Sequence, residues 1–231
     1  MLVLGLDLET SGLAPESDEI IEIGAVLWDV ERAYPLKVLS VMVKPSAPLD
    51  SQVTQITGLT SEDLERWGIT CQEALKQLSD LAQWAECIVA HNGLGFDKKF
   101  LEVAWKECPD FQVGLPWVDT MYDLPFSENI GTRKLDYLAA EHGFLNPFSH
   151  RALFDVLTML KILSNYSFAD VLQLSRSPLV KVVAQVSFEE KDKAKELGFR
   201  WDPKQRVWYS EMKQVVFERK RSEYPFSTVL I

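Results

Sequence analysis

The chain has 231 residues, 47% of them hydrophobic and 25% charged, with 34 acidic and 24 basic side chains and a formal net charge of -10. This composition is that of a globular protein and excludes bulk disorder and fibrous repeats. At about 150 residues per domain, the length predicts one sizeable domain with a smaller one attached. The acidic balance excludes a basic protein that coats nucleic acid.

The N-terminus and the cysteines bear on the cellular compartment. Residues 1–7 have no basic segment ahead of an apolar one, so a signal peptide is not expected. No run of about 18 apolar residues occurs, which predicts the absence of a membrane span. Cys71, Cys87 and Cys108 form neither a CxxC pair nor a disulfide framework. We therefore expect a cytoplasmic protein in a reducing compartment.

The first part of the chain predicts an antiparallel meander followed by helices. Residues 2–8, 20–30 and 36–43 are apolar or alternating and are separated by short polar segments. Thr60 is placed to cap a helix, and an apolar helical pattern follows over 72–84.

Strands and helices then alternate. A buried strand over 86–90 ends at a His-Asn-Gly loop, a helix comes next, and a short strand covers 117–121. Helices over 133–142 and 151–164 complete the pattern. The fold class predicted is α/β, with a mixed five-stranded sheet flanked by helices.

The chain changes character near residue 165. We expect a catalytic domain over 1–165, a linker with a short helix over 166–178, and a small β-α-β-β module over 179–231. The net charge also differs between the two parts of the chain. Residues 1–175 hold 12 basic and 26 acidic side chains, whereas residues 176–231 hold 12 basic and 8 acidic ones, a net charge of +4.

The first polar cluster is Asp7 with Glu9 at the end of the first strand. Alternation along a strand places both carboxylates on one face. Two carboxylates on a largely buried strand are unfavourable unless a cation neutralises them, and Mg²⁺ binds carboxylate oxygens well. Solvated acids at a strand end are the alternative interpretation.

Two further clusters contain histidine and aspartate. The segment 91–97 follows a buried strand, where ligands bind in α/β sheets, although Asp97 is also explained as a helix cap. His150 precedes Asp155 by five residues at the start of the last helix of the domain. A surface histidine ahead of an amphipathic helix is the alternative there.

Taken in order, the three clusters resemble a known family. They are Asp7-Leu8-Glu9, then Phe96-Asp97 after the His-Asn-Gly loop, then His150 with Asp155. This order resembles the DEDDh group of 3′-5′ exonucleases, which are relatives of the proofreading exonuclease subunit of bacterial DNA polymerase III on a ribonuclease-H-like fold. The stretches 19–26 and 56–60 are also similar to the family, and the resemblance covers about residues 1–165.

The resemblance implies a catalytic machinery. Asp7, Glu9, Asp97 and Asp155 would hold two Mg²⁺ or Mn²⁺ ions, with Asp7 bridging them. His150 would take the proton from the attacking water, and a histidine at this position indicates the His type of the family rather than its Tyr-bearing sister group.

The resemblance also implies substrate contacts. Leu8 and Thr10 would touch the terminal nucleotide, and Phe96 would form an apolar wall beneath its base or sugar. We expect Asn92, in the loop before Phe96, to be a substrate-binding residue as well. Ordinary packing is the alternative for these positions.

The C-terminal module carries a second set of candidates. Residues 193–202, followed by residues 206–209, resemble a small uncharacterised module that is found appended to nucleic-acid enzymes. Its candidates for nucleic-acid contact are Arg200, Trp201, Lys204, Arg206 and Trp208. The alternative is that both tryptophans form the core of a very small domain, which leaves the basic residues available for phosphate.

These features predict a metal-dependent 3′-5′ exonuclease that releases nucleoside 5′-monophosphates. Its expected partner is nucleic acid with a free 3′ end, preferably single-stranded DNA. The alternatives are the same chemistry on RNA or oligoribonucleotides and, from another class, a non-catalytic nucleic-acid-binding or polymerase-associated factor. The acid set argues against the latter, because unused buried carboxylates lower stability.

Overall fold

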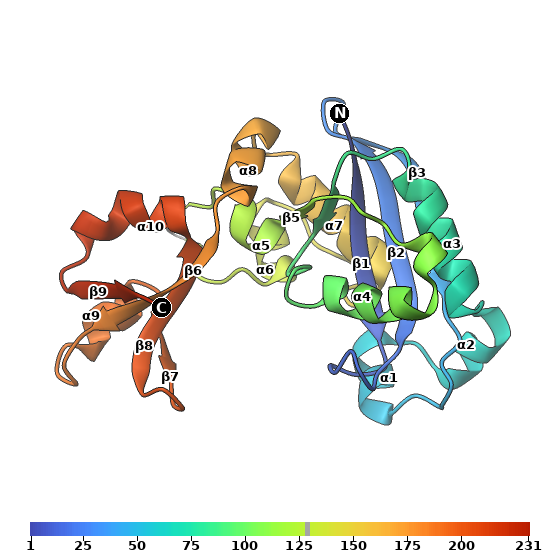
Figure 1. Cartoon of the computed structure of the whole chain (residues 1–231), viewed down its shortest axis with the longest axis horizontal. Helices are drawn as coiled ribbons and strands as arrows, with labels where there is room; N and C mark the ends of the chain where they lie inside the picture. Colours follow the sequence, from blue (N-terminus) through green and yellow to red (C-terminus); the bar gives the residue numbers. More distant parts are fainter. Residues whose placement is uncertain (128–129) are drawn as a thin grey trace. The chain divides into compact units, whose positions relative to one another are not determined.

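A computed structural model describes residues 1–127 and 130–231. The chain divides into two compact units, Met1–Val171 and Leu172–Ile231, and each is considered by itself (Figure 1). Within the described residues, every helix is too short or too polar to cross a lipid bilayer.

The first unit is built on a mixed five-stranded sheet with the strand order β3-β2-β1-β4-β5. Its strands are β1 (Leu2–Thr10), β2 (Ile20–Asp29), β3 (Tyr34–Met42), β4 (Ile88–Ala90) and β5 (Trp117–Asp119). Strands β1 to β3 pair antiparallel, whereas β4 and β5 continue the sheet in parallel with β1. The predicted α/β fold class is confirmed.

Helices cover both faces of this sheet (Figure 1). The helices of this part of the chain are α1 (Ser51–Thr57), α2 (Ser61–Trp67), α3 (Cys71–Ala82), α4 (Asp97–Glu107), α5 (Thr120–Asp123), α6 (Leu135–Glu141) and α7 (Ala152–Leu163), with α8 (Phe168–Ser175) across the division between the units and a 3₁₀ turn at Pro109–Phe111. Leu4 and Leu6 of β1 point into a core shared with α3 and α4. The opposite face of β1 packs against α7, where a Cβ on Gly5 would lie 2.7 Å from Leu160 Cδ1.

Local signals explain where several helices begin. Thr60 caps α2 through a capping box with Asp63, as its sequence context predicts. Thr70 and Glu73 form a second capping box, which starts α3 at Cys71, one residue before the predicted helix. Helix α1 was not predicted, because only seven residues separate its Asp50 cap from the left-handed Gly58 that ends it.

The second unit contains a four-stranded antiparallel sheet with the order β7-β8-β6-β9. Its elements are β6 (Leu179–Gln185), α9 (Lys191–Glu196), β7 (Arg200–Asp202), β8 (Val207–Lys213), α10 (Gln214–Lys220), a 3₁₀ turn (Arg221–Glu223) and β9 (Ser227–Leu230). The predicted β-α-β-β order is present as β6, α9, β7 and β8. The sequence did not predict α10 or β9, which extend it.

Candidate active site

A cavity of about 550 Å³ opens at the end of β1 in the first unit. This volume is typical of a site for a small ligand or a nucleotide. All nine residues predicted for the catalytic domain line it: Asp7, Leu8, Glu9, Thr10, Asn92, Phe96, Asp97, His150 and Asp155. Side chains from the start and from the end of the domain therefore meet in one place.

Strand β1 delivers the first two carboxylates. Asp7 and Glu9 follow Gly5 on the strand face that packs against α7, as alternation predicts. The absence of a side chain at Gly5 lets α7 approach closely, and the strand then presents its carboxylates just beyond that contact. Both acids retain partial exposure, which is directed to the cavity.

Asp97 is tied directly to the same strand. The backbone N–H of Leu8 donates to Asp97 Oδ1 at 2.9 Å, so this buried carboxylate lies beside Asp7 and Glu9. Asp97 is the first residue of α4, and the preceding residue, Phe96, makes no side-chain cap. The geometry therefore places Asp97 in the acidic cluster, in addition to opening a helix.

A buried aspartate that the sequence analysis missed holds the loop before Asp97. Asp119, at the end of β5, accepts the N–H groups of Asn92 at 2.9 Å and Leu94 at 3.2 Å. Asn92 itself has a φ of 63°, the left-handed region that Asn tolerates better than most residues. The sequence signal for Asp119 was its place as an acid within the short strand predicted over 117–121.

His91 lines the cavity but is engaged structurally. Its Nδ1 lies 2.9 Å from Thr120 Oγ1, and its Nε2 lies 2.7 Å from the carbonyl oxygen of Arg133. Burial lowers the pKa of His91. An imidazole bonded on both nitrogens orders the loop.

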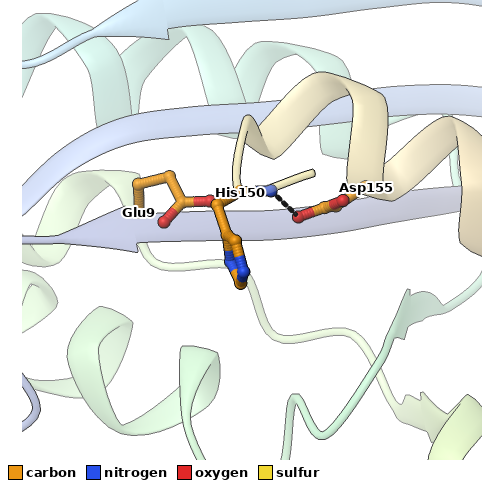
Figure 2. A group of neighbouring side chains, drawn as sticks. All are labelled: Glu9, His150 and Asp155. Atoms are coloured by element: carbon orange, nitrogen blue, oxygen red, sulfur yellow. Dashed lines mark hydrogen bonds between the residues drawn. The ribbon is translucent and has the colours of Figure 1, made fainter. Parts of the chain in front are cut away.

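His150 and Asp155 lie at the start of α7 (Figure 2). Asp155 Oδ2 accepts the backbone N–H of His150 at 3.0 Å, and Asn146 Nδ2 donates to its other oxygen. This bond and a left-handed φ of 62° turn the imidazole of His150 away from α7, as Figure 2 shows. Glu9, His150 and Asp155 offer ligand atoms within 4.8 Å of one another.

Glu22 on β2 anchors the segment that carries His150. Its carboxylate is 1% exposed and accepts Arg151 Nη2 at 2.9 Å and the N–H of Ala152 at 3.0 Å. The neighbouring Gly24 permits this contact, because a Cβ there would lie 2.3 Å from the Ala152 carbonyl carbon. Both residues lie in the stretch 19–26 that resembles the family, yet sequence reasoning gave them no role.

The carboxylates of the cluster have raised pKa values. Burial, together with the charges of Asp97 and Glu9, raises the pKa of Asp7 well above its usual range. Burial followed by the charge of Asp155 raises the pKa of Glu9 to about 8. Burial also raises the pKa of Asp97 to about 7 and that of Asp155 to about 6.

Nearby cations do not offset this concentration of negative charge. The Arg151 guanidinium lowers the pKa of Glu9, but it is the smallest of the effects on that group and is already paired with Glu22. Hard divalent cations take carboxylate oxygens as ligands and neutralise such clusters. The donor set therefore fits divalent metal ions.

Three apolar side chains that were not predicted also line the cavity. Leu13 and Ile56 are 85% and 50% exposed, and Val53 lies beside them in the lining. Ile56 and Val53 belong to α1, the helix that the sequence pattern did not reveal. Apolar residues left exposed at a cavity are suited to contact a planar ligand such as a nucleobase.

The five candidates of the C-terminal module lie in the second unit. Trp201 on β7 faces Trp208 on β8, with 5.8 Å between the ring centroids, and Trp208 packs against the core. Arg200 reaches Glu211 at 3.3 Å. Lys204 and Arg206 lie in the turn between these strands.

The α/β fold and its acidic cavity indicate the site of an enzyme, and sequence comparison identifies the family. Residues 4–163 match the family described as Exonuclease (RNase_T), so the chain belongs to this exonuclease family. The predicted resemblance to DEDDh exonucleases is thereby confirmed. Residues 181–217 match a domain of unknown function, DUF5710.

Curated relatives of the chain include polymerases. DNA polymerase III PolC-type from Thermotoga maritima is 33% identical over 150 residues, which cover 65% of this chain and 10% of the relative. The PolC-type protein from Mycoplasmopsis pulmonis is 38% identical over 96 residues, covering 42% of this chain and 6% of the relative. The chain thus spans about a tenth or less of the length of these relatives.

Solved structures share the fold. The nuclease domain of 3′hExo, a DEDDh family member bound to rAMP, superposes with a TM-score of 0.59 at 19% identity, over 71% of this chain and 90% of that domain. E. coli exonuclease I in complex with a dT13 oligonucleotide gives 0.61 at 16% identity, over 84% of this chain and 50% of that protein. These similarities agree with the five-stranded sheet and its flanking helices.

Proposed function

We propose that this protein is a 3′-5′ exonuclease that removes nucleoside 5′-monophosphates from the 3′ end of single-stranded nucleic acid, preferably DNA. The observation that carries the proposal is the convergence of Asp7, Glu9, Asp97 and Asp155 beside His150 in one cavity. Membership of the exonuclease family supports the reaction class. The apolar side chains that line the cavity together with the carboxylates support a nucleotide as the ligand.

The four carboxylates are the proposed ligands of two Mg²⁺ or Mn²⁺ ions. Their raised pKa values support this role, because a cation would relieve the repulsion that burial intensifies. When bound, the ions would supply stabilisation for charge on the attacking and leaving oxygens. Asp7 is central to the cluster, since Asp97, Glu9 and Asp155 all raise its pKa.

His150 is the proposed general base. Its imidazole takes a proton from the attacking water, whose oxygen forms a bond to phosphorus. The bond from phosphorus to the 3′ oxygen of the preceding nucleotide breaks, and that oxygen receives a proton as it leaves. Glu22 supports this role indirectly, because its bonds to Arg151 and Ala152 fix the chain beside His150.

Terminal-nucleotide contacts follow from the cavity lining. We propose that Leu8, Thr10, Asn92 and Phe96 contact the 3′ nucleotide, as the sequence resemblance implies. The exposed Ile56 is also proposed to contact the base, together with Leu13 and Val53.

DNA is preferred as the substrate because the matching curated relatives carry the name DNA polymerase III PolC-type, and one structural neighbour holds dT13. RNA is the second candidate, favoured by the neighbour bound to rAMP and by a 3′-exonuclease that recognises histone mRNA stem-loops. A non-catalytic factor is disfavoured, because carboxylates kept buried without a function lower stability.

The test is a matched panel of 5′-labelled single-stranded DNA, duplex DNA and RNA of one sequence, incubated with Mg²⁺ or Mn²⁺. We expect a ladder of products shortened from the 3′ end, formed fastest from single-stranded DNA. Release of the labelled 5′ nucleotide as the first product, or cleavage that starts internally, would contradict the polarity. Faster shortening of the RNA would select the second candidate, and no shortening of any strand would reject an exonuclease.

A further inference from the structure

The turn between β7 and β8 carries two exposed cations, Lys204 and Arg206. Lys204 and Arg206 are exposed, and in the parts of the chain that the structure describes neither forms a salt bridge. The other cations beside this hairpin are neutralised, because Lys181 lies 3.3 Å from Asp202 and Arg200 pairs with Glu211. Of these cations on and beside the hairpin, Lys204 and Arg206 are therefore the ones left available to a ligand.

Hydrogen bonds hold this turn in a fixed shape. Asp202 Oδ1 accepts the N–H groups of Lys204 at 2.9 Å and Gln205 at 3.0 Å. Lys181 Nζ donates to Gln205 Oε1 at 2.8 Å from the neighbouring strand β6. Such an aspartate-closed turn presents its side chains in one arrangement, which reduces the entropy lost when a ligand binds them.

Arg206 occupies a backbone conformation that arginine adopts rarely. Its φ is 54°, in the left-handed region where glycine or asparagine is the ordinary residue. An arginine at this position is unfavourable for the fold by itself. Unfavourable backbone conformations of this kind are found mainly at functional sites, which suggests a functional role for the Arg206 side chain.

Trp201 completes the surface next to these cations. Its side chain is 47% exposed, although it contacts Trp208, and Trp208 packs against the core. The buried core of the second unit consists of other side chains: Val182, Ala184, Ala194, Phe199 and Phe217. The fold thus uses Trp208 as an anchor and leaves much of the Trp201 ring accessible.

We propose that this hairpin is a second binding site, which takes a single strand of nucleic acid, with a base stacked on Trp201 and phosphates at Lys204 and Arg206. Stacking on an aromatic ring beside cations is how proteins hold single strands without reading their sequence. The net charge of +4 over residues 176–231 favours a polyanion there. The choice of a strand over another polyanion rests on the proposed exonuclease function.

The test measures binding of the full-length protein to fluorescent oligodeoxythymidylate and oligouridylate of about 20 nucleotides in EDTA, which prevents metal-dependent hydrolysis. Trp201→Ala should raise the Kd about fivefold or more. Arg206→Gly removes one phosphate contact at a position where glycine is favoured, and should lower the slope of log Kd against log salt by about 0.7. Retained thermal stability separates this loss from unfolding.

Lys195→Ala is the matched control, since Lys195 is an exposed cation on α9 of the same unit. We expect it to leave both Kd and salt slope unchanged. Equal weakening by Lys195→Ala, wild-type binding by the Trp201 and Arg206 variants, or displacement of the strand by polyglutamate at equal charge would overturn the proposal. The last result would indicate an acidic protein as the partner.

The same measurement distinguishes this proposal from the proposed enzyme activity. Binding in EDTA requires no hydrolysis. If the protein binds strands through the hairpin but does not shorten them, the result supports the second binding site and rejects the exonuclease function. If the protein shortens strands but all hairpin variants bind like the wild type, the result supports the exonuclease function and rejects the second binding site. Comparing the two oligonucleotides shows whether DNA or RNA is held more tightly.

Discussion

In the first unit, four carboxylates surround one cavity and burial raises their pKa values, whereas in the second unit Lys204 and Arg206 project from an exposed turn. The two arrangements differ in how they affect the stability of the protein when no ligand is bound. Buried charges of one sign destabilise a protein until a ligand of opposite charge arrives, but exposed charges are solvated and cost little. The first arrangement therefore favours neutralisation, by protons or by a bound cation, whereas the second leaves its charges accessible to an anion.

The largest effect is expected from Asp7→Asn. Removing this central carboxylate should abolish detectable hydrolysis in Mg²⁺, because three other acids of the site lie close enough to Asp7 to raise its pKa. The same variant should melt at a higher temperature than the wild type in EDTA, because repulsion within the cluster decreases. Hydrolysis of 5′-labelled DNA and thermal melting check the two expectations.

Asp7→Asn also tests whether hydrolysis in the first unit and strand binding in the second unit are separate functions. Binding of an oligonucleotide in EDTA should not become weaker in this variant, since the hairpin holds the strand there. Weakening as severe as that of Arg206→Gly would show that the two units do not divide the work in this way.

His150→Asn should lower kcat by about 10²- to 10⁴-fold, the usual contribution of a general base. Asparagine suits the φ of 62° at this position, so the backbone should keep its course and the melting temperature should stay close to that of the wild type. Single-turnover hydrolysis with saturating enzyme gives the rate of the chemical step. A rate within a few-fold of the wild type would assign the proton transfer to another group.

Asp119→Asn should lower kcat by about tenfold, as is typical when a group that orients the residues of a metal site is lost. An amide offers one acceptor oxygen where the carboxylate receives the N–H groups of both Asn92 and Leu94. Hydrogen exchange at those two amides should become faster. The control is Asp110→Asn, an exposed aspartate of the same unit, which should change neither exchange nor kcat.

A further expected effect is on the free energy of unfolding as a function of pH. Glu9 has a pKa of about 8 in the folded protein against 4.5 ordinarily, so between these values the unfolded chain releases a proton that the folded chain keeps. The free energy of unfolding in EDTA should therefore fall as the pH rises from about 5 to 8. Mg²⁺ should restore the melting temperature at the upper end of this range. A melting temperature that rises with pH in EDTA would contradict the charge repulsion.

Much of the fold followed from the sequence, because its signals are local. The apolar runs of β1 and β2 and the capping residue of α2 depend on residues within one turn or one strand. Helix α10 and strand β9 were missed, since β9 is a four-residue strand that becomes one only by pairing with β6. Helix α1 is similarly short, and its exposed Ile56 gave no periodic signal.

The sequence by itself determined which residues are candidates for chemistry: the acids and histidine of three separated clusters, on the spacing of Asp7 with Glu9 and of His150 with Asp155. Only the tertiary structure decided that these clusters share one cavity and which residues hold them there. Glu22 and Asp119 act through bonds to segments 129 and 27 residues away, and no local pattern encodes such partners. Burial, which gives these carboxylates their raised pKa values, likewise exists only once the sheet and helices have packed.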